Sequence, residues 1–318
     1  MSETQEHEEA PAVTLTQEEE ANVKEQVPHR SPVVFEIIRR SGEEELNRPL
    51  ASLWWSGLCA GLSIGFSVLS QALLRKYLPD ASWTPLIEKL GYTIGFAIVI
   101  LARQQLFTEN TITAVVPLMA HPHLKNLLLV MRLWLAVLIA NVVGATFFSL
   151  FLTYGGALDA DLLKFIHDIS VHATVAPPGA LIGRGVVAGF LIATLVWIMA
   201  GIEGSKLSVI VLFTYLIALG NFGHVVAGSV EASFLVIDGT QSIGQAIFGF
   251  FFPALIGNML GGTAIFTLLA YGQIRNELKD QQLGRPEDRG DGGTGPNANK
   301  TDRPARPTSR GGAKDSVA

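Results

Sequence analysis

The stretch Leu216–Val230, "LIALGNFGHVVAGSV", interrupts a long apolar region with glycines, an asparagine and a histidine. The apolar segment before it, Leu207–Leu219, has 13 residues. At ~1.5 Å per residue such a helix reaches only about 20 Å, less than the ~30 Å of bilayer hydrocarbon. A second apolar segment, Val225–Ile237, follows. Because non-helical backbone at membrane depth must be buried in protein or line a watery cavity, the stretch predicts a broken transmembrane helix.

A second region of the chain has the same form. The apolar segments "LGYTIGFAIVIL" (Leu90–Leu101) and "ITAVVPLMA" (Ile112–Ala120) flank the polar stretch "ARQQLFTENT" (Ala102–Thr111). The chain therefore predicts an all-α membrane protein with six crossings, of which the second and fifth are broken. The continuous crossings are expected at Leu50–Leu74, Leu127–Leu152, Ile182–Ile202 and Ile247–Leu269.

Composition agrees with a membrane protein. Of 318 residues, 49% are hydrophobic and 16% are charged, whereas soluble domains have roughly 25% charged residues. Two tails are predicted, because both ends hold too few apolar residues to build a core. The N-terminal tail, 1–31, is acidic and disordered, and the C-terminal tail, 272–318, is cytoplasmic and mostly disordered. Between them, 32–49 is predicted to be an amphipathic helix before the membrane, either lying on its surface or solvated as a linker. Residues 50–271 form the predicted six-span domain.

Several classes of protein are excluded. The single cysteine, Cys59, allows no intrachain disulfide, and the polar N-terminus does not resemble a cleavable secretory signal. No basic stripe predicts nucleic-acid binding. We expect no enzyme, cofactor or metal site, because the sequence shows no nucleophile triad, phosphate loop or metal cluster. His121 and His123, in a proline-containing loop, are too few to hold a metal ion.

The two halves of the membrane region resemble each other. "SGLCAGLSIGFSV" (Ser56–Val68) shares five of 13 positions with "RGVVAGFLIATLV" (Arg184–Val196). "LIANVVGATFFSLFL" (Leu138–Leu152) shares six of 15 with "LIGNMLGGTAIFTLL" (Leu255–Leu269). These matches occur in the same order, which predicts an internal repeat.

Each repeat, about 50–155 and 180–271, holds three crossings, so the second repeat starts on the opposite face of the membrane. This predicts an inverted repeat whose broken helices meet near the midplane and form the permeation site. Eight lysines and arginines flank one face and five the other, which favours both termini in the cytoplasm.

Three motifs in the predicted spans resemble the formate/nitrite transporter family: "LFTENTITAVVP" (Leu106–Pro117), "GNFGHVVAGSVE" (Gly220–Glu231) and "PALIGNMLGGT" (Pro253–Thr263). The resemblance covers about Leu50 to Tyr271 and is greatest to an uncharacterised branch from bacterial inner membranes. It implies an aquaporin-like protomer, a homopentamer in the lipid bilayer and one pore per protomer. The implied substrates are small monovalent anions such as formate, nitrite or hydrosulfide, often moved with a proton.

The resemblance also implies roles for individual residues. Leu106, Phe107 and Thr108 match a constriction and gate on the cytoplasmic side, and His224 matches a central pore histidine. A histidine between apolar constrictions can hydrogen-bond an anion or give it a proton, since its unperturbed pKa is about 6.5. The alternatives are a neutral His224 bonded to a backbone carbonyl, a Thr108 that caps the next helix, and ordinary core packing of Leu106 and Phe107.

The sequence departs from the family pattern at several pore positions. Gly223 replaces a glutamate and Gly228 an asparagine, Ile217 stands where the family has the phenylalanine of its outer constriction, and Ala193 or Thr194 replaces a pore asparagine. The resemblance therefore predicts the fold of the membrane domain, whereas these replacements leave open which anion the pore selects. Of the remaining residues of the second break, Asn221 is expected to bond freed backbone groups. Gly220 and Gly223 are expected to permit its unusual backbone.

Three ionisable residues flank the breaks, where they are functional candidates by default. Arg103 and Glu109 lie on either side of the first break, and Glu231 follows the second. Arg103 could attract anions in a vestibule. We prefer a structural role, in which Arg103 and Glu109 form an ion pair or Arg103 bonds loop carbonyls. Glu231 is expected to stabilise the second break similarly.

Three functions remain open. The first is a channel or transporter for small monovalent anions or weak acids, proton-linked through His224. The second is a neutral-solute pore, although the paired Asn-Pro-Ala motifs of aquaporins do not occur. The third is a membrane scaffold subunit without flux of its own.

Overall fold

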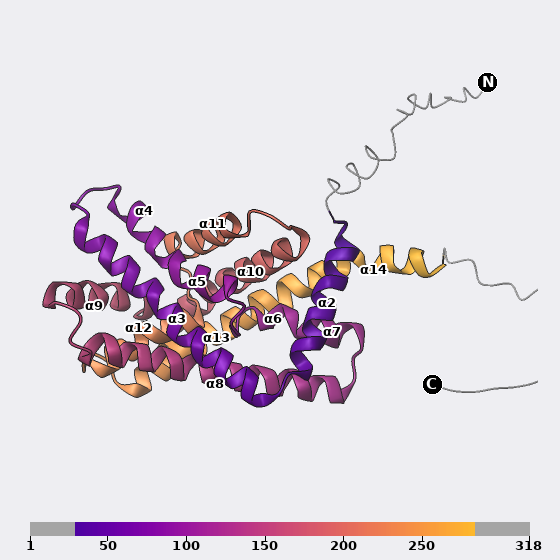
Figure 1. Cartoon of the computed structure of the whole chain (residues 1–318), viewed down its shortest axis with the longest axis horizontal. Coiled ribbons are helices and arrows are strands. Elements are labelled where there is room, and N and C mark those ends of the chain that lie inside the picture. Colours follow the sequence, from indigo (N-terminus) through magenta and orange to yellow (C-terminus); the bar gives the residue numbers. More distant parts are fainter. Residues whose placement is uncertain (1–28, 284–318) are drawn as a thin grey trace, which may run out of the picture.

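The computed structural model describes residues 29–283, and every regular element in that range is a helix (Figure 1). Five stretches in this range are long and apolar enough to cross a membrane: Leu50–Tyr77, Thr84–Leu101, Leu124–Tyr154, Pro178–Gly201 and Gln245–Arg275. Three shorter apolar stretches complete the two broken spans: Asn110–Ala120, Lys206–Leu219 and Val225–Ile237. The expectation of an all-helical membrane protein with two broken helices is confirmed.

The first half begins with α3 (Leu50–Tyr77), the first continuous crossing. The broken second crossing follows as α4 (Thr84–Glu88), a 3₁₀ turn (Lys89–Gly91) and α5 (Tyr92–Leu101), then the break, α6 (Asn110–Thr113) and α7 (Val115–Ala120). The third crossing is α8 (Leu124–Tyr154).

The second half repeats this order. The fourth crossing is α10 (Pro178–Gly201), and the broken fifth crossing is α11 (Lys206–Leu219) and α12 (Val225–Ile237). The last crossing is one long helix with two π-helical stretches: Gln245–Phe251, α13 (Phe252–Met259), Leu260–Thr267 and α14 (Leu268–Leu283).

One predicted boundary was wrong, and one helix was not predicted. The leading part of the second crossing begins at Thr84 rather than Leu90, so this part alone is 18 residues long. In addition, α9 (Ala160–Thr174) lies between the third and fourth crossings, where no helix was expected. The Asp159 carboxylate caps it by accepting from the Leu162 N–H at 2.9 Å. The helix packs against α3 and α12.

Glycines allow equivalent helices of the two halves to pack closely. In the first half α3 lies along α8, and in the second α10 lies along α13. A Cβ on Gly61 of α3 would collide with the backbone carbonyl of Asn141, and a Cβ on Gly189 of α10 would collide with that of Asn258. Both helix pairs therefore depend on glycine at the same place. The inverted orientation of the two halves across a membrane stays a prediction.

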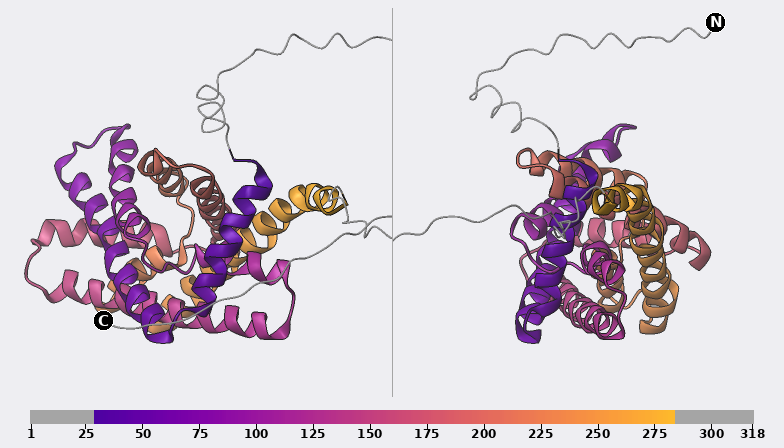
Figure 2. Two further views of the ribbon diagram at one scale, coloured as in Figure 1. Left: turned by 45° about the vertical axis from the view of Figure 1, so that its right-hand side comes forward. Right: turned by 90° about the vertical axis from the view of Figure 1, so that its right-hand side faces the viewer.

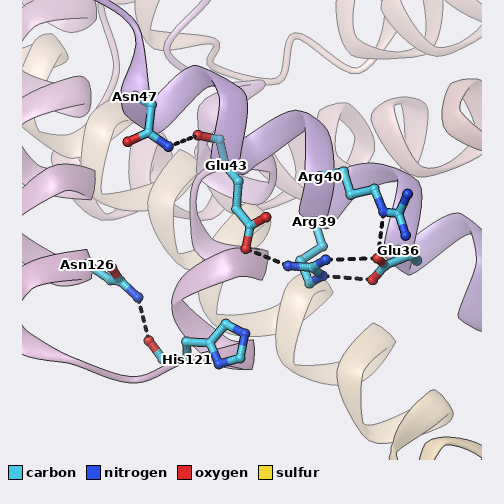
Figure 3. Close-up of polar contacts among 7 residues, drawn as sticks. All are labelled: Glu36, Arg39, Arg40, Glu43, Asn47, His121 and Asn126. Atoms are coloured by element: carbon cyan, nitrogen blue, oxygen red, sulfur yellow. Dashed lines mark hydrogen bonds and ion pairs between the residues drawn. The ribbon is translucent and has the colours of Figure 1, made fainter. Parts of the chain in front are cut away.

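A helix precedes the membrane region. It is α2 (Ser31–Asn47), and it packs against α7, α10 and α14 at one end of the molecule. Figure 2 shows α2 beside α14 from two further sides. Arg39 lies between Glu36 and Glu43 and pairs with both, while Arg40 also pairs with Glu36 (Figure 3). These arginines lower the pKa of Glu36 to about 2. Of the predicted tails 1–31 and 272–318, residues 1–28 and 284–318 lie outside the described range, and 272–283 belong to α14.

Candidate functional site

The Asn141 side chain of α8 closes the first break. Its Oδ1 accepts from the Phe107 N–H at 2.9 Å. Its Nδ2 donates to the carbonyls of Gly57 and Gln105, at 2.8 and 2.9 Å. Backbone groups in a break lose their helical partners and must find others when buried. Asn141 supplies these partners and is itself fully buried.

The Asn258 side chain of α13 does the same for the second break. Its Oδ1 accepts from the Val225 N–H at 2.8 Å, and its Nδ2 donates to the carbonyls of Gly185 and Gly223 at 2.9 and 2.7 Å. The two sets of three bonds correspond group by group. The sequence repeat therefore extends to the hydrogen bonds that hold the two breaks.

The backbone turns at each break through a residue other than glycine. Arg103 and Asn221 have φ of 52° and 49°, the left-handed region. In each case the next residue donates its N–H to the carbonyl five residues earlier, at 3.0 Å, which is the Schellman ending of a helix. Gly220 does not itself adopt the left-handed region, since its φ is −78°, but a Cβ there would overlap the ring of Phe222, so the turn does depend on glycine at this position. The Asn221 side chain donates to the His172 carbonyl at 3.1 Å, a backbone group of α9 rather than of the break.

A hydrogen bond joins the two breaks. The Oγ1 of Thr108, in the first break, lies 2.7 Å from the Nε2 of His224, in the second. The Nδ1 of His224 accepts from the Ala227 N–H at 3.2 Å and so caps α12. Because Nδ1 accepts, the ring proton of this neutral imidazole lies on Nε2 and is donated to Thr108. Both side chains are almost completely buried, and the Phe96 ring meets the imidazole edge-on with centroids 4.9 Å apart.

A narrow cavity of about 30 Å³ lies beside the second break; we call it the His224 cavity. Besides His224, five residues singled out in the sequence line it: Ile217, Asn221, Gly223, Gly228 and Glu231. The volume is enough for one or two water molecules. Its other polar lining residues are Gln71, Lys89 and Tyr92.

A larger cavity of about 280 Å³ lies beside the first break; we call it the Arg103 cavity. Arg103, Glu109 and Lys206 line it, together with apolar residues of α5 and α10. The predicted ion pair between the first two residues is not formed: among the described residues no salt bridge or hydrogen bond joins Arg103 to Glu109, and no side-chain hydrogen bond joins Arg103 to a loop carbonyl, the other form of the expected structural role. Oε1 of Glu109 has no hydrogen-bond partner. Arg103 takes the helix-ending position, which directs the chain away from α5.

The residues expected to form the cytoplasmic-side constriction are buried within the first break. Leu106 and Phe107 are 0% and 1% exposed, and neither lines the His224 or the Arg103 cavity. Phe107 packs edge-on against Trp134, with centroids 5.9 Å apart. Of these three residues of the first break, Thr108 contacts the second break through His224.

The structure explains one departure from the family pattern. A Cβ on Gly228 would overlap the ring of Phe250, which comes from the last crossing and lines the His224 cavity. The space next to residue 228 is therefore already filled. A Cβ on Gly223 would meet its nearest atom, the Leu181 carbonyl oxygen, at 3.8 Å, an ordinary contact.

Sequence reasoning missed several residues of this region. Asn141 and Asn258 follow the two breaks at almost equal spacing, 33 residues after Thr108 and 34 after His224. This spacing supports the internal repeat, but no role was predicted for the two side chains. Phe250 and Gln71 had no signal of their own, because they come from helices far away in the sequence. Lys89 and Lys206 looked like ordinary flanking cations.

Two broken apolar helices, joined by a hydrogen bond between their breaks and with a cavity beside each break, define a helical membrane transport protein. The model of the formate/nitrite transporter family matches residues 32–272. The chain belongs to this family.

Curated relatives agree with the assignment. The chain is 40% identical to inner membrane protein YfdC of Escherichia coli over 259 residues, which cover 81% of this chain and 84% of that protein. It is 28% identical to the nitrite transporter NirC of Salmonella typhimurium over 163 residues, 50% of this chain and 58% of that one.

Two solved structures share the fold. An FNT family ion channel superimposes with a TM-score of 0.64 at 21% identity, over 76% of this chain and 98% of its own. A pentameric formate channel with formate bound gives 0.60 at 18% identity, over 71% and 98%.

Proposed function

We propose that this protein is a channel or transporter for small monovalent anions or weak acids, such as formate or nitrite, with His224 and Thr108 at its central site. The hydrogen bond between the two breaks carries this proposal, together with membership of the family. A permeant carboxylate that separates the two side chains can accept from the Thr108 hydroxyl and from the Nε2–H of His224. The Nε2–H of His224 would then exchange the Thr108 oxygen for an oxygen of the permeant, and the Thr108 hydroxyl would donate to the permeant as well.

The other predicted residues take their roles around this pair. Asn221 holds the second break at the edge of the His224 cavity, where Ile217 contributes to a constriction. Leu106 and Phe107 form the constriction of the first break. Because an apolar constriction passes a neutral acid more easily than an anion, we propose proton exchange at His224.

The proposals for the oligomeric state and the cellular location rest on similar proteins. A homopentamer with one pore per protomer is supported by the fold shared with a pentameric formate channel. A bacterial inner membrane is supported by the relative named for that location. Both termini are proposed to be cytoplasmic, with α2 and α14 on that face.

Uptake of labelled formate, nitrite and acetate into proteoliposomes tests the proposal. The protein should accelerate at least one of them over liposomes without protein. If none crosses faster, and the purified protein holds a stoichiometric partner, a scaffold role replaces this proposal. Osmotic swelling with glycerol separates a neutral-solute pore from both.

A further inference from the structure

Four phenylalanines stand close together near the start of the last crossing, at positions 248, 250, 251 and 252, and one of them points inward. Phe248 and Phe252 are 71% and 43% exposed, and their rings stack on each other with centroids 5.8 Å apart. Phe250, between them in the chain, is 1% exposed. Of the four, Phe250 lines the His224 cavity and the other three do not.

The backbone that carries Phe250 is π-helical. The stretch Gln245–Phe251 has this form, and at its end the Phe252 N–H donates to the Ile247 carbonyl, five residues earlier. A π-helical turn accommodates an extra residue, so it changes which side chains of a helix face inward, and such turns occur frequently at functional sites. Here the turn packs against α12, the helix that His224 caps.

The ring of Phe250 covers Gly228, one helical turn after His224. The Gly228 N–H donates to the His224 carbonyl at 2.8 Å, and residues four apart lie on the same face of a helix. A Cβ on Gly228 would overlap the ring, and the nearest ring atom is Cζ, at its tip. Glycine is therefore the residue that admits a phenyl ring this close to α12. Gly228 and Phe250 fit each other as a pair, and the ring fills space on the helix face that carries His224.

The space that the ring leaves free is small. The His224 cavity holds about 30 Å³, enough for one or two water molecules. Helix α11 bounds it with the buried side chains of Ile217 and Ala218. Because protein interiors are closely packed, a larger permeant passes only if these side chains move. Acetate is formate with a methyl group in place of hydrogen, and one such group in a fitted pocket changes a rate about tenfold or more.

We propose that Phe250 sets the upper size limit of this pore, so that formate and nitrite pass and anions that carry a methyl group, such as acetate, are excluded. This rests on the proposed function and specifies its substrate class. The edge of the ring contacts the permeant, and no bond forms or breaks. The glycine at position 228 belongs to the same device, because it admits the ring.

The test compares Phe250→Ala with Phe234→Ala in proteoliposomes that contain the full chain. Both substitutions remove a buried phenyl ring, but Phe234, on α12, does not line the cavity. Uptake of labelled formate, nitrite and acetate is measured at a single pH, and the leak through liposomes without protein is subtracted. In the wild type, acetate should enter at least about tenfold more slowly than formate. Phe250→Ala should raise the ratio of acetate to formate uptake about tenfold, and Phe234→Ala should leave this ratio unchanged.

The ratio of the two rates separates pore size from loss of folded protein, because fewer active pores lower both rates equally. An unchanged ratio in Phe250→Ala overturns the proposal, and so does an equal rise in Phe234→Ala. If Phe250→Ala does not fold, Phe250→Leu, which removes the ring but keeps an apolar side chain, is measured against the same criteria. A wild-type protein that passes none of the three ions overturns the proposed function and, with it, this proposal. A wild-type protein that passes acetate as fast as formate overturns this proposal alone.

Discussion

The Thr108 hydroxyl and the Nε2 of His224 lie 2.7 Å apart, although 116 residues separate them in the chain. Each side chain belongs to one of the two breaks, and each break is held by an asparagine from the following crossing. The contact is therefore made between two rigidly held loops. Its geometry depends on the packing of both halves of the molecule.

Replacing Thr108 with valine keeps the shape of the side chain and removes this contact. The buried Nε2–H of His224 then lacks its partner, which should cost about 1–3 kcal/mol of stability. Formate uptake should fall about tenfold, the rate equivalent of ~1.4 kcal/mol. Thr214→Val is the matched control, because the buried Thr214 hydroxyl bonds only the Ile210 carbonyl of its own helix. Equal losses of formate uptake in Thr108→Val and Thr214→Val would contradict a role for the Thr108 contact.

Asn141→Leu and Asn258→Leu should destabilise the protein by similar amounts. Each removes three hydrogen bonds from a buried break and leaves several backbone groups unsatisfied, for an expected loss of about 3 kcal/mol or more. Thermal unfolding in detergent measures it. Asn47→Leu removes one exposed bond, to the Glu43 carbonyl, and should cost less than about 0.5 kcal/mol. A large loss for only one of the two break asparagines would show that the breaks are not equivalent.

Gly228→Asn should lower stability because the new side chain would overlap the Phe250 ring. Overpacking of this kind costs about 1–3 kcal/mol. The second substitution Phe250→Ala removes the ring and should restore part of the loss, so the double variant should be more stable than the sum of the single effects. A double-mutant cycle of thermal unfolding measures this coupling. Strictly additive effects would mean that the ring does not occupy the space next to residue 228.

The contact between α2 and the first break should strengthen in acid. Oε2 of Glu45 accepts from Thr113 Oγ1 at 3.0 Å, and Oε1 accepts from Gln105 at 3.4 Å. Burial raises the pKa of Glu45 above its ordinary 4.5, although these bonds oppose the shift. The folded protein therefore holds a proton that the unfolded chain has released, so this contribution to stability declines as the pH rises above 4.5.

Hydrogen exchange of the α2 amides, corrected for intrinsic rates, measures this effect. Protection should be greater at about pH 5 than at about pH 8, and Glu45→Gln should remove the difference. Glu44→Gln, on the exposed side of the same helix, is the control. Greater amide protection of wild-type α2 at about pH 8 than at about pH 5 would contradict this explanation.

Much of the fold could be predicted from the sequence. The breaks are visible because a 13-residue apolar segment is too short to cross a bilayer and because glycine, asparagine and histidine follow it. Helix α9 was missed for the opposite reason: its buried residues, Leu162, Ile166 and Ile169, recur at helical spacing but never form a long apolar run. The Asp159 cap was the remaining signal.

The site was less predictable than the fold. Thr108 and His224 were identified from motifs, but their hydrogen bond requires two loops to meet in space. The Phe250 ring occupies the space beside Gly228 from a helix more than 20 residues away, which no local pattern encodes. The left-handed backbone of Arg103 had no signal in the sequence, because arginine seldom adopts this conformation.

The pH dependence of formate uptake in wild-type protein and in His224→Ala tests the central claim most directly. Uptake into proteoliposomes is measured from about pH 5 to about pH 8, across the ordinary titration range of histidine, and assembly is checked by the size of the detergent-solubilised protein. We expect wild-type uptake to rise as the pH falls, and His224→Ala to assemble normally while losing that dependence. An assembled His224→Ala protein whose uptake follows the wild-type pH profile would contradict the account.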